Sequence, residues 1–203
     1  MTTILVTGFG PFPGAPVNPT GPLVRALARA VRLPRVKLVP HLFETSYAAV
    51  DRDLPPLIAQ HKPDMLLMFG LATRARLVRV ETFARNVVGV TLDVSGKTLQ
   101  RRTIVPGGPA TRPLPVRGHD LLKALRAAQV PAMLSRDAGG YLCNYLCWRA
   151  TEVAAAVDGP RVAAFIHVPP IRRTSRGLGR ITHDDLVRGG AQLLVTLAAA
   201  ARR

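Results

Sequence analysis

The sequence predicts an α/β fold in which helices cover both faces of a mainly parallel β-sheet. Short apolar runs rich in Val, Ile and Leu alternate along the chain with longer segments of helical periodicity. Such alternation is typical of parallel strands joined by helices. No internal repeat appears, and the Pro- and Gly-rich stretches at 10–19, 104–118 and 169–180 are too short to be domain linkers. We therefore expect residues 1–203 to form a single domain.

Apolar runs predict the strands, which in chain order are Thr3–Thr7, Val36–Pro40, Met65–Phe69, Leu77–Phe83, Ala132–Ser135 and Val162–His167. Helical spacing of apolar side chains predicts helices at Gly21–Ala30, Tyr47–Gln60, Asp120–Gln129, Leu142–Val157 and Asp184–Ala200. Asn18, Pro19 and Thr20 precede the first helix, and Thr182 precedes the last. These residue types favour the start of a helix. Because ligand sites lie at the carboxyl ends of parallel strands, we expect the functional residues where the strands end.

The composition is that of a globular protein. The chain has 203 residues and a mass of 21.8 kDa, with 48% apolar residues, 20% charged residues and a mean hydropathy of +0.18. These values exclude wholesale disorder. A domain of this size buries roughly 70% of the surface of its unfolded chain, so it needs no metal or disulfide to fold. The sequence begins without a basic leader, and no apolar run approaches the ~20 residues that cross a bilayer. We expect a cytoplasmic protein without a membrane partner.

The net charge leaves a second class of function open. Lys and Arg number 28 against 12 Asp and Glu, which gives a charge of +16 and a pI near 11.5. Such a field attracts nucleic acids, so a basic nucleic-acid-binding protein is the alternative function. The arginines are scattered, however, and the Arg- and Gly-rich segment 172–180 has no aromatic side chain that would stack on bases. Nucleic acid is therefore the less favoured partner.

The two cysteines, Cys143 and Cys147, predict different roles. Their spacing on a helix does not suit a disulfide, and no Cys or His stands nearby at the spacing of metal ligands, so we expect no metal. Cys143 follows the glycine turn 137–141 at the start of a predicted helix. A helix N-terminus lowers the pKa of a thiol, and its free N–H groups can receive an oxyanion. Cys143 is thus the candidate nucleophile, and Cys147 is expected to lie in the core.

Two further side chains fit a thiol site. His167 ends the apolar run from Val162, where it is either a capped core residue or the imidazole partner of a thiolate. Glu81 lies within the apolar run that begins at Leu77, and a carboxylate there needs a partner. If Glu81 has a structural role, its partner is Arg79 or Arg85. If it has a catalytic role, its partner is His167, because a carboxylate would orient the imidazole and hold it protonated.

The glycine-rich loop after the first strand does not predict a cofactor. Thr7-Gly8-Phe9-Gly10 resembles a dinucleotide-binding loop, but such a loop leads directly into a helix whose N-terminus receives the pyrophosphate. Here Pro11, Pro13, Pro16 and Pro19 intervene. We expect no cofactor and a rigid loop. Phe9 and Phe12 either pack beneath this loop or line a pocket, and the sequence favours neither.

Four segments together resemble the pyroglutamyl peptidase type I family, also called pyrrolidone-carboxylate peptidases. They are Val6–Phe12 with Asn18–Thr20, Gly70–Ala72 leading to Glu81–Asn86, Ala138–Tyr145, and Phe165–Pro169. The resemblance implies an α/β/α sandwich with a mixed sheet and a catalytic site of Glu81, Cys143 and His167. It implies a cysteine exopeptidase that needs no cofactor, assembles as a homo-oligomer (a tetramer or dimer), and removes N-terminal pyroglutamyl residues from peptides through a thioester.

The substrate that the resemblance implies carries a small, flat and partly apolar lactam ring. We expect Phe9 and Phe12 to sandwich this ring, Asn18 or backbone groups to read its amide, and Leu71 to line the same pocket. One departure from the family opens a further alternative, because the position of a family arginine is occupied by Thr91. That alternative is a catalytically weak relative that binds a modified peptide.

Overall fold

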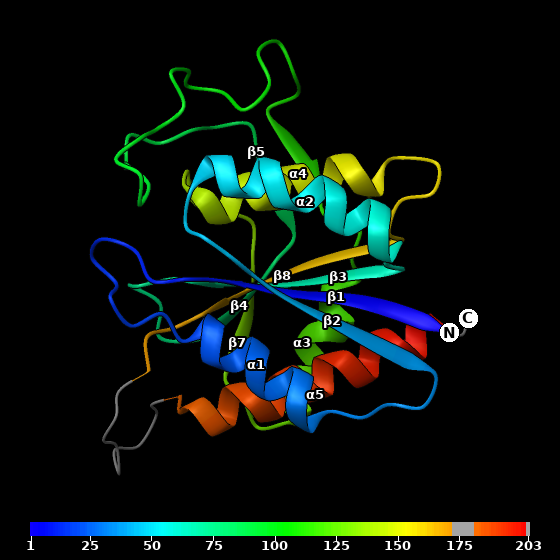
Figure 1. Cartoon of the computed structure of the whole chain (residues 1–203). Coiled ribbons are helices and arrows are strands. Elements are labelled where there is room, and N and C mark those ends of the chain that lie inside the picture. The colour runs from blue at the N-terminus through cyan, green and yellow to red at the C-terminus, as the bar shows by residue number, and fades with distance from the viewer. Residues whose placement is uncertain (172–180, 202–203) are drawn as a thin grey trace.

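The computed structural model describes residues 1–171 and 181–201, and at its centre lies a six-stranded sheet (Figure 1). The strands in spatial order are β2 (Val36–Phe43), β1 (Thr2–Phe9), β3 (Met65–Leu71), β8 (Val162–Val168), β4 (Val78–Glu81) and β7 (Ala132–Ser135). Neighbouring strands from β2 to β8 are parallel, and so are β4 and β7, but β4 runs antiparallel to β8. The mixed, mainly parallel sheet is confirmed.

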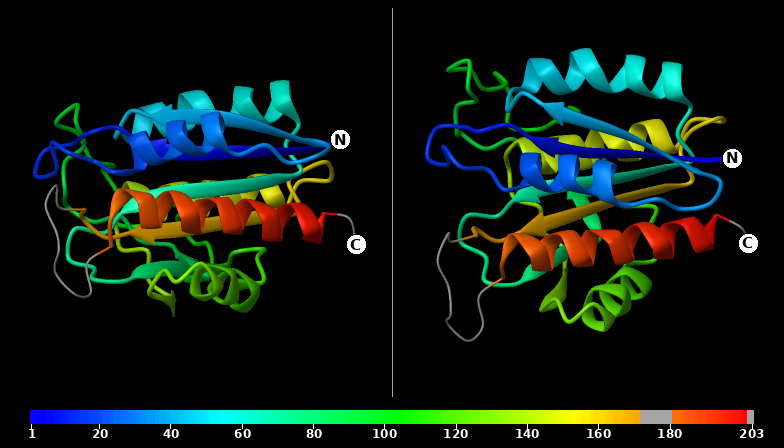
Figure 2. Two further views of the ribbon diagram at one scale, coloured as in Figure 1. Left: turned by 90° about the horizontal axis from the view of Figure 1, so that it is seen from below. Right: turned by 60° about the horizontal axis from the view of Figure 1, so that its bottom comes forward.

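Helices form an outer layer on each face of the sheet (Figures 1 and 2). One layer holds α1 (Thr20–Ala30), α3 (Gly118–Ala127) and α5 (His183–Ala200), and the other holds α2 (Tyr47–His61) and α4 (Leu142–Ala154). Alternate strand residues pack toward opposite layers: on β8, Ala164 and Ile166 belong to the core under α5, whereas Ala163 and Phe165 belong to the core under α4. This alternation shows which face of the sheet each strand residue occupies.

One predicted strand is wrong in its extent. The run expected at Leu77–Phe83 divides at Thr82, where the chain leaves the large sheet, and residues Phe83–Arg85 (β5) pair antiparallel with Thr111–Pro113 (β6). β6 lies in a stretch that the sequence predicts as a loop. Apolar alternation is the same before and after Thr82, so the pattern cannot reveal that the strand changes its partner.

The helices begin and end close to their predicted bounds. α3 begins two residues before the expected Asp120, and α4 ends at Ala154 rather than Val157. Thr182 caps α5 as expected: its hydroxyl accepts the N–H of Asp185, whose carboxylate accepts the N–H of Thr182 at 2.8 Å. Within the described part of the chain, no helix is both long and apolar enough to span a membrane. The Arg- and Gly-rich segment 172–180 lies outside the described residues.

Candidate active site

The sheet presents Glu81 and His167 on the face that α2 and α4 cover. Phe165 packs into the core on this face, and His167, two residues further along β8, therefore faces the same way. Glu81 also lies on this face, since its neighbour Val80 packs into the opposite core. The antiparallel register places Glu81 opposite Phe165, so His167 is the diagonal neighbour of Glu81 across the two strands.

The carboxylate of Glu81 accepts a hydrogen bond from the imidazole of His167. Nδ1 of His167 lies 2.8 Å from Oε1 of Glu81, and the exposed fractions of the two side chains are 6% and 0%. A charged pair attracts more strongly in so dry a site than at the surface. The predicted pairing of Glu81 with His167 is confirmed. Arg85 pairs instead with Asp137 at 2.8 Å.

The pKa of His167 is raised to about 9. Burial is the largest single influence and lowers the pKa, but the negative charges of Cys143 and Glu81 and their hydrogen bonds to the imidazole together outweigh it. The imidazole is therefore a cation at neutral pH. In that form it can stabilise a neighbouring thiolate and can later give up a proton.

Cys143 meets His167 from the helical layer above the sheet. The residue lies in the first turn of α4, where backbone N–H groups have no partner within the helix and the helix dipole favours negative charge. Its thiol rests against Gly70 of β3, the register partner of His167. A Cβ atom at Gly70 would stand only 2.7 Å from the sulfur. Glycine therefore leaves the space that the partly exposed thiol occupies.

Cys147 lies one turn further along α4 and is fully buried. Burial raises the pKa of this thiol well above its usual value, and the negative charges of Cys143 and Glu81 raise it further. A thiol that stays protonated is a poor nucleophile. The expectation that Cys147 is a core residue is confirmed.

Polar contacts hold the turn that precedes α4. Gly139 has a φ of +84°, a left-handed conformation that glycine adopts without strain, and its N–H donates to Asp137 at 2.9 Å. The buried amide of Asn144 accepts the N–H of Arg85 and donates to the carbonyl of Arg85, both at 2.8 Å. Sequence reasoning did not single out Asn144, although its position directly after Cys143 was a usable signal.

The aromatic residues expected at the pocket occupy two environments. Phe9 is only 2% exposed and packs on Phe43, with 5.9 Å between ring centroids. Phe12 is half-buried, and its ring centroid lies 6.1 Å from that of Tyr141. Burial is the main cause of the raised pKa of Tyr141, and the charge of Cys143 adds to it, so the pair Phe12–Tyr141 lies near the thiol. Phe9 lies in the core instead. Tyr141 is a pocket candidate that sequence reasoning missed.

The structure gives Asn18 and Leu71 positions that differ from those expected of pocket residues. The amide of Asn18 donates to the carbonyl of Gly10 at 2.9 Å and accepts the N–H and O–H of Thr20 at 3.1 and 2.9 Å, so it is used in holding the loop. Leu71 ends β3, and the alternation along that strand turns its side chain toward the opposite face. Thr91, which the resemblance places where the family has an arginine, is exposed.

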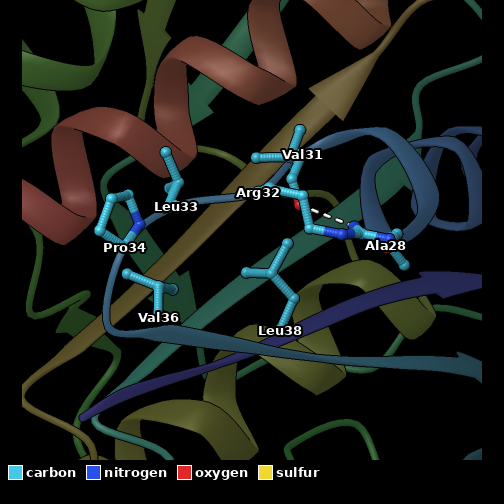
Figure 3. A pocket seen from close by; sticks show the side chains of 7 residues that line it. All are labelled: Ala28, Val31, Arg32, Leu33, Pro34, Val36 and Leu38. Atoms are coloured by element: carbon cyan, nitrogen blue, oxygen red, sulfur yellow. Dashed lines mark hydrogen bonds between the residues drawn. The ribbon is translucent and has the colours of Figure 1, made fainter.

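A hollow away from the thiol lies at the edge of the sheet, between the end of α1 and strand β2 (Figure 3). Its lining is mainly apolar, and its one charged group, Arg32, donates to the carbonyl of Ala28 at 2.9 Å. This lining contains no nucleophile, acid or base, so the hollow does not compete with the thiol site. In residues 1–171 and 181–201, no group of three or more His, Cys, Asp or Glu side chains is placed to hold a metal ion.

Comparisons with known proteins agree on one family. Residues 2–181 match the family model described as pyroglutamyl peptidase. The pyrrolidone-carboxylate peptidase of Thermococcus onnurineus is 34% identical over 169 residues, covering 82% of each chain. That of Pyrococcus furiosus is 30% identical over 171 residues, covering 83% of this chain and 81% of the relative. The solved pyrrolidone carboxyl peptidase of Fervidobacterium islandicum has a TM-score of 0.88 at 25% identity, covering 98% of this chain and 99% of that one.

Proposed function

The chain belongs to the pyroglutamyl peptidase family of cysteine peptidases, and from this premise we propose how three of its side chains carry the reaction. The enzyme removes an N-terminal pyroglutamyl residue from a peptide. Cys143 is the nucleophile, His167 carries the protons, and Glu81 positions the imidazole. One observation supports these roles above all: His167 hydrogen-bonds to Glu81 at 2.8 Å, and, although burial opposes it, Cys143 and Glu81 together raise the pKa of the imidazole.

The first half-reaction forms a thioester. The thiolate of Cys143 attacks the carbonyl carbon of the pyroglutamyl residue, a C–S bond forms, and the carbonyl oxygen becomes an oxyanion. The oxyanion then collapses, the C–N bond of the scissile peptide breaks, and imidazolium His167 gives its proton to the leaving amine. The shortened peptide departs, and the imidazole is left neutral.

The second half-reaction restores the enzyme. Neutral His167 takes a proton from a water molecule, whose oxygen attacks the thioester carbonyl. The C–S bond breaks, pyroglutamate leaves, and Cys143 is again a thiolate beside an imidazolium. Throughout the cycle Glu81 fixes the orientation of the imidazole and favours its cationic form.

The start of α4 supplies the electrostatic part of the mechanism. The backbone N–H groups in its first turn have no partner within the helix, and we assign to them the stabilisation of the oxyanion that develops beside Cys143. Loss of one such donor typically raises the barrier by ~3 kcal/mol. Asn144 and the glycine turn hold these groups in place before substrate arrives, because their contacts join α4 to β5 and to Asp137.

The lactam ring of the substrate packs against the apolar surface that Phe12 and Tyr141 form together, because their rings contact each other at a centroid distance of 6.1 Å and leave no space between them. Phe9 packs in the core against Phe43, and Asn18 holds the loop that carries Phe12 through its hydrogen bond to the carbonyl of Gly10. Backbone groups of the loops therefore read the lactam amide, since the amide of Asn18 is already occupied.

The broader expectations from the sequence also belong to this proposal. The resemblance to the family supports an assembly of two or four copies, a cytoplasmic location and a single peptidase domain spanning 1–203. Sedimentation velocity of the purified protein measures the assembly directly. The nucleic-acid-binding alternative gains no support from the comparisons.

The direct test is release of a chromophore from a pyroglutamyl amide. We expect Cys143→Ala to lower kcat/KM by more than about a thousandfold, because no other group can form the thioester. The matched control is Cys147→Ala, which removes a thiol from the same helix and keeps the activity. Iodoacetamide is expected to label Cys143 before Cys147. Parent-level hydrolysis by a folded Cys143→Ala variant would contradict the proposal.

A further inference from the structure

Arg79 is a cation beside the reaction centre that the mechanism leaves unused. It lies on β4 directly opposite His167 in the antiparallel register, on the same face as Glu81. Side chains in directly opposed positions have their Cβ atoms about 4.5–5.5 Å apart. The side chain of Arg79 therefore starts beside that of His167 and is long enough to reach the space next to the imidazole that protonates the leaving group.

No carboxylate in residues 1–171 and 181–201 forms an ion pair with Arg79, although Arg85 nearby is paired with Asp137. The pKa of Asp137 is lowered mainly by its hydrogen bond from Arg85, which burial opposes, and the charge of Arg79 lowers it further. The guanidinium is thus close to the turn that carries the nucleophile. Arg79 is half-buried, so an anion bound there is screened less than at an open surface.

The sheet face beside Arg79 is open to solvent. Met133 of β7 is the register partner of Arg79 on the side away from His167, and it is 43% exposed. β7 is also the edge strand of the sheet. A large apolar side chain stays so exposed on a sheet only where no helix covers it. A peptide that leaves the site over β4 therefore has room to lie along this face.

The order of the strands gives the direction in which the leaving peptide extends. In the order of the sheet, the loop after β1 carries Phe12, which we assign to the lactam ring, and β3 lies against Cys143. The next strands, β8 and β4, carry His167 and Arg79. The leaving nitrogen must sit at His167 to receive its proton. The acyl part of the substrate then lies toward β1, and the rest of the peptide lies toward β4.

We infer that Arg79 binds a carboxylate of the leaving peptide next to the scissile bond, so that the enzyme prefers substrates with a negative charge at the second residue. The inference rests on the proposed function. The planar guanidinium can hold both oxygens of a carboxylate at once. Two sources supply that group: the side chain of an acidic second residue, and the terminal carboxylate of a pyroglutamyl dipeptide.

Matched pairs of substrates test the inference and distinguish the two sources. Pyroglutamyl-aspartyl amide and pyroglutamyl-asparaginyl amide differ by one side-chain charge at nearly constant size. Pyroglutamyl-alanine and its amide differ by the terminal charge. We expect the parent enzyme to prefer the charged member of at least one pair by about fivefold or more in kcat/KM, the effect of one partly buried ion pair. Each ratio is measured within one enzyme preparation, so the active fraction cancels.

Variants of Arg79 assign the preference to its side chain. Arg79→Gln is expected to bring the ratio close to one, and Arg79→Glu to reverse it. Arg79→Lys retains the charge but not the planar fork, and it is expected to keep part of the ratio. The matched control is Arg126→Gln, which removes an exposed arginine from α3 in the other helical layer and leaves the ratio unchanged.

The outcomes separate this inference from the function on which it rests. Ratios of one in the parent, with the neutral substrates still cleaved, overturn the role of Arg79 and leave the peptidase in place. A preference that persists in both Arg79→Gln and Arg79→Glu also overturns it. Absence of hydrolysis of every pyroglutamyl substrate overturns the proposed function, and the inference fails with it.

Discussion

Glu81 and His167 form a buried, hydrogen-bonded pair of a carboxylate and an imidazole. The second carboxylate oxygen of Glu81 is buried and has no hydrogen-bond partner within the described residues, so the carboxylate directs its interactions at the imidazole alone. The raised pKa of His167 follows from this carboxylate together with Cys143. A charge paired in this way sets the pH range over which the enzyme works.

The substitution Glu81→Gln tests that control of pH. The pKa of His167 is about 9 when folded against an ordinary 6.5, so we expect kcat/KM of the parent to fall as the imidazolium loses its proton near pH 9. Gln keeps the size and an accepting oxygen but lacks the charge, so the pKa of His167 falls and the alkaline limb moves to lower pH. The pH profile of kcat/KM on one pyroglutamyl amide measures the shift.

His167→Ala is the comparison for this experiment, because it removes the proton carrier rather than its partner. It is expected to be nearly as damaging as Cys143→Ala. An unchanged rate and profile in Glu81→Gln would make Glu81 a structural residue and reduce the catalytic unit to a dyad.

At the scale of the elements, the departure of β5 from the large sheet has a functional consequence. The strand break at Thr82 carries residues Phe83–Arg85 up to the nucleophile helix. There the amide of Asn144 clamps α4 to this strand through Arg85 and to the carbonyl of Val87 at 3.1 Å. The segment that begins with Glu81, the partner of the imidazole, therefore also positions the helix that carries the thiol.

Asn144→Ala is expected to weaken both stability and catalysis. It leaves the partly buried N–H and carbonyl of Arg85 and the carbonyl of Val87 without the Asn144 amide, which lowers the free energy of unfolding by roughly 2 kcal/mol. The first turn of α4 then shifts, and kcat per active site falls. Urea unfolding and thiol titration measure the two effects.

A helix cap remote from the site provides the control. Thr182→Ala removes the cap of α5 and is expected to lower stability by about 1 kcal/mol without changing kcat. If Asn144→Ala were to lose stability but keep the kcat of the parent, Asn144 would be a structural residue only.

At the scale of the whole molecule, we expect the charge of +16 to act as a general field rather than as a binding site, because the arginines are scattered along the sequence. Several arginines are paired with acids on the surface, as Arg52 is with Asp53 and Arg188 is with Asp185. Ion pairs of this kind neutralise part of the positive charge, and the other arginines are scattered along the chain. We therefore expect a diffuse positive potential. Such a potential attracts polyanions in a way that depends strongly on salt.

We therefore expect random single-stranded RNA to bind weakly and to dissociate as salt rises. Fluorescence anisotropy of a labelled oligomer at about 50 and 200 mM salt measures this, and a steep fall in affinity is expected. The control is a neutral polymer of similar size. Tight binding that persists at 200 mM salt, in a protein without peptidase activity, would favour the nucleic-acid-binding alternative.

The amino-acid sequence by itself determined the local features of this protein. The alternation of apolar runs and helical periodicity predicted the α/β class, and the glycine turn before Cys143 predicted a thiol at a helix start. His167 at the end of an apolar run and Glu81 within another were recognised as candidates in the same way. These features depend on residues that are only a few positions apart, so the pattern of residue types along the chain is enough to predict them.

Only the tertiary structure decided which groups meet. The sequence left Glu81 with Arg79, Arg85 or His167 as partner, and it gave no reason to divide the strand at Thr82 or to orient Leu71 away from the thiol. The antiparallel register of β4 and β8 chose His167 and brought Arg79 opposite it. Strand direction and register depend on pairing between segments more than 80 residues apart in the chain, and a one-residue change of register would turn every side chain to the other face.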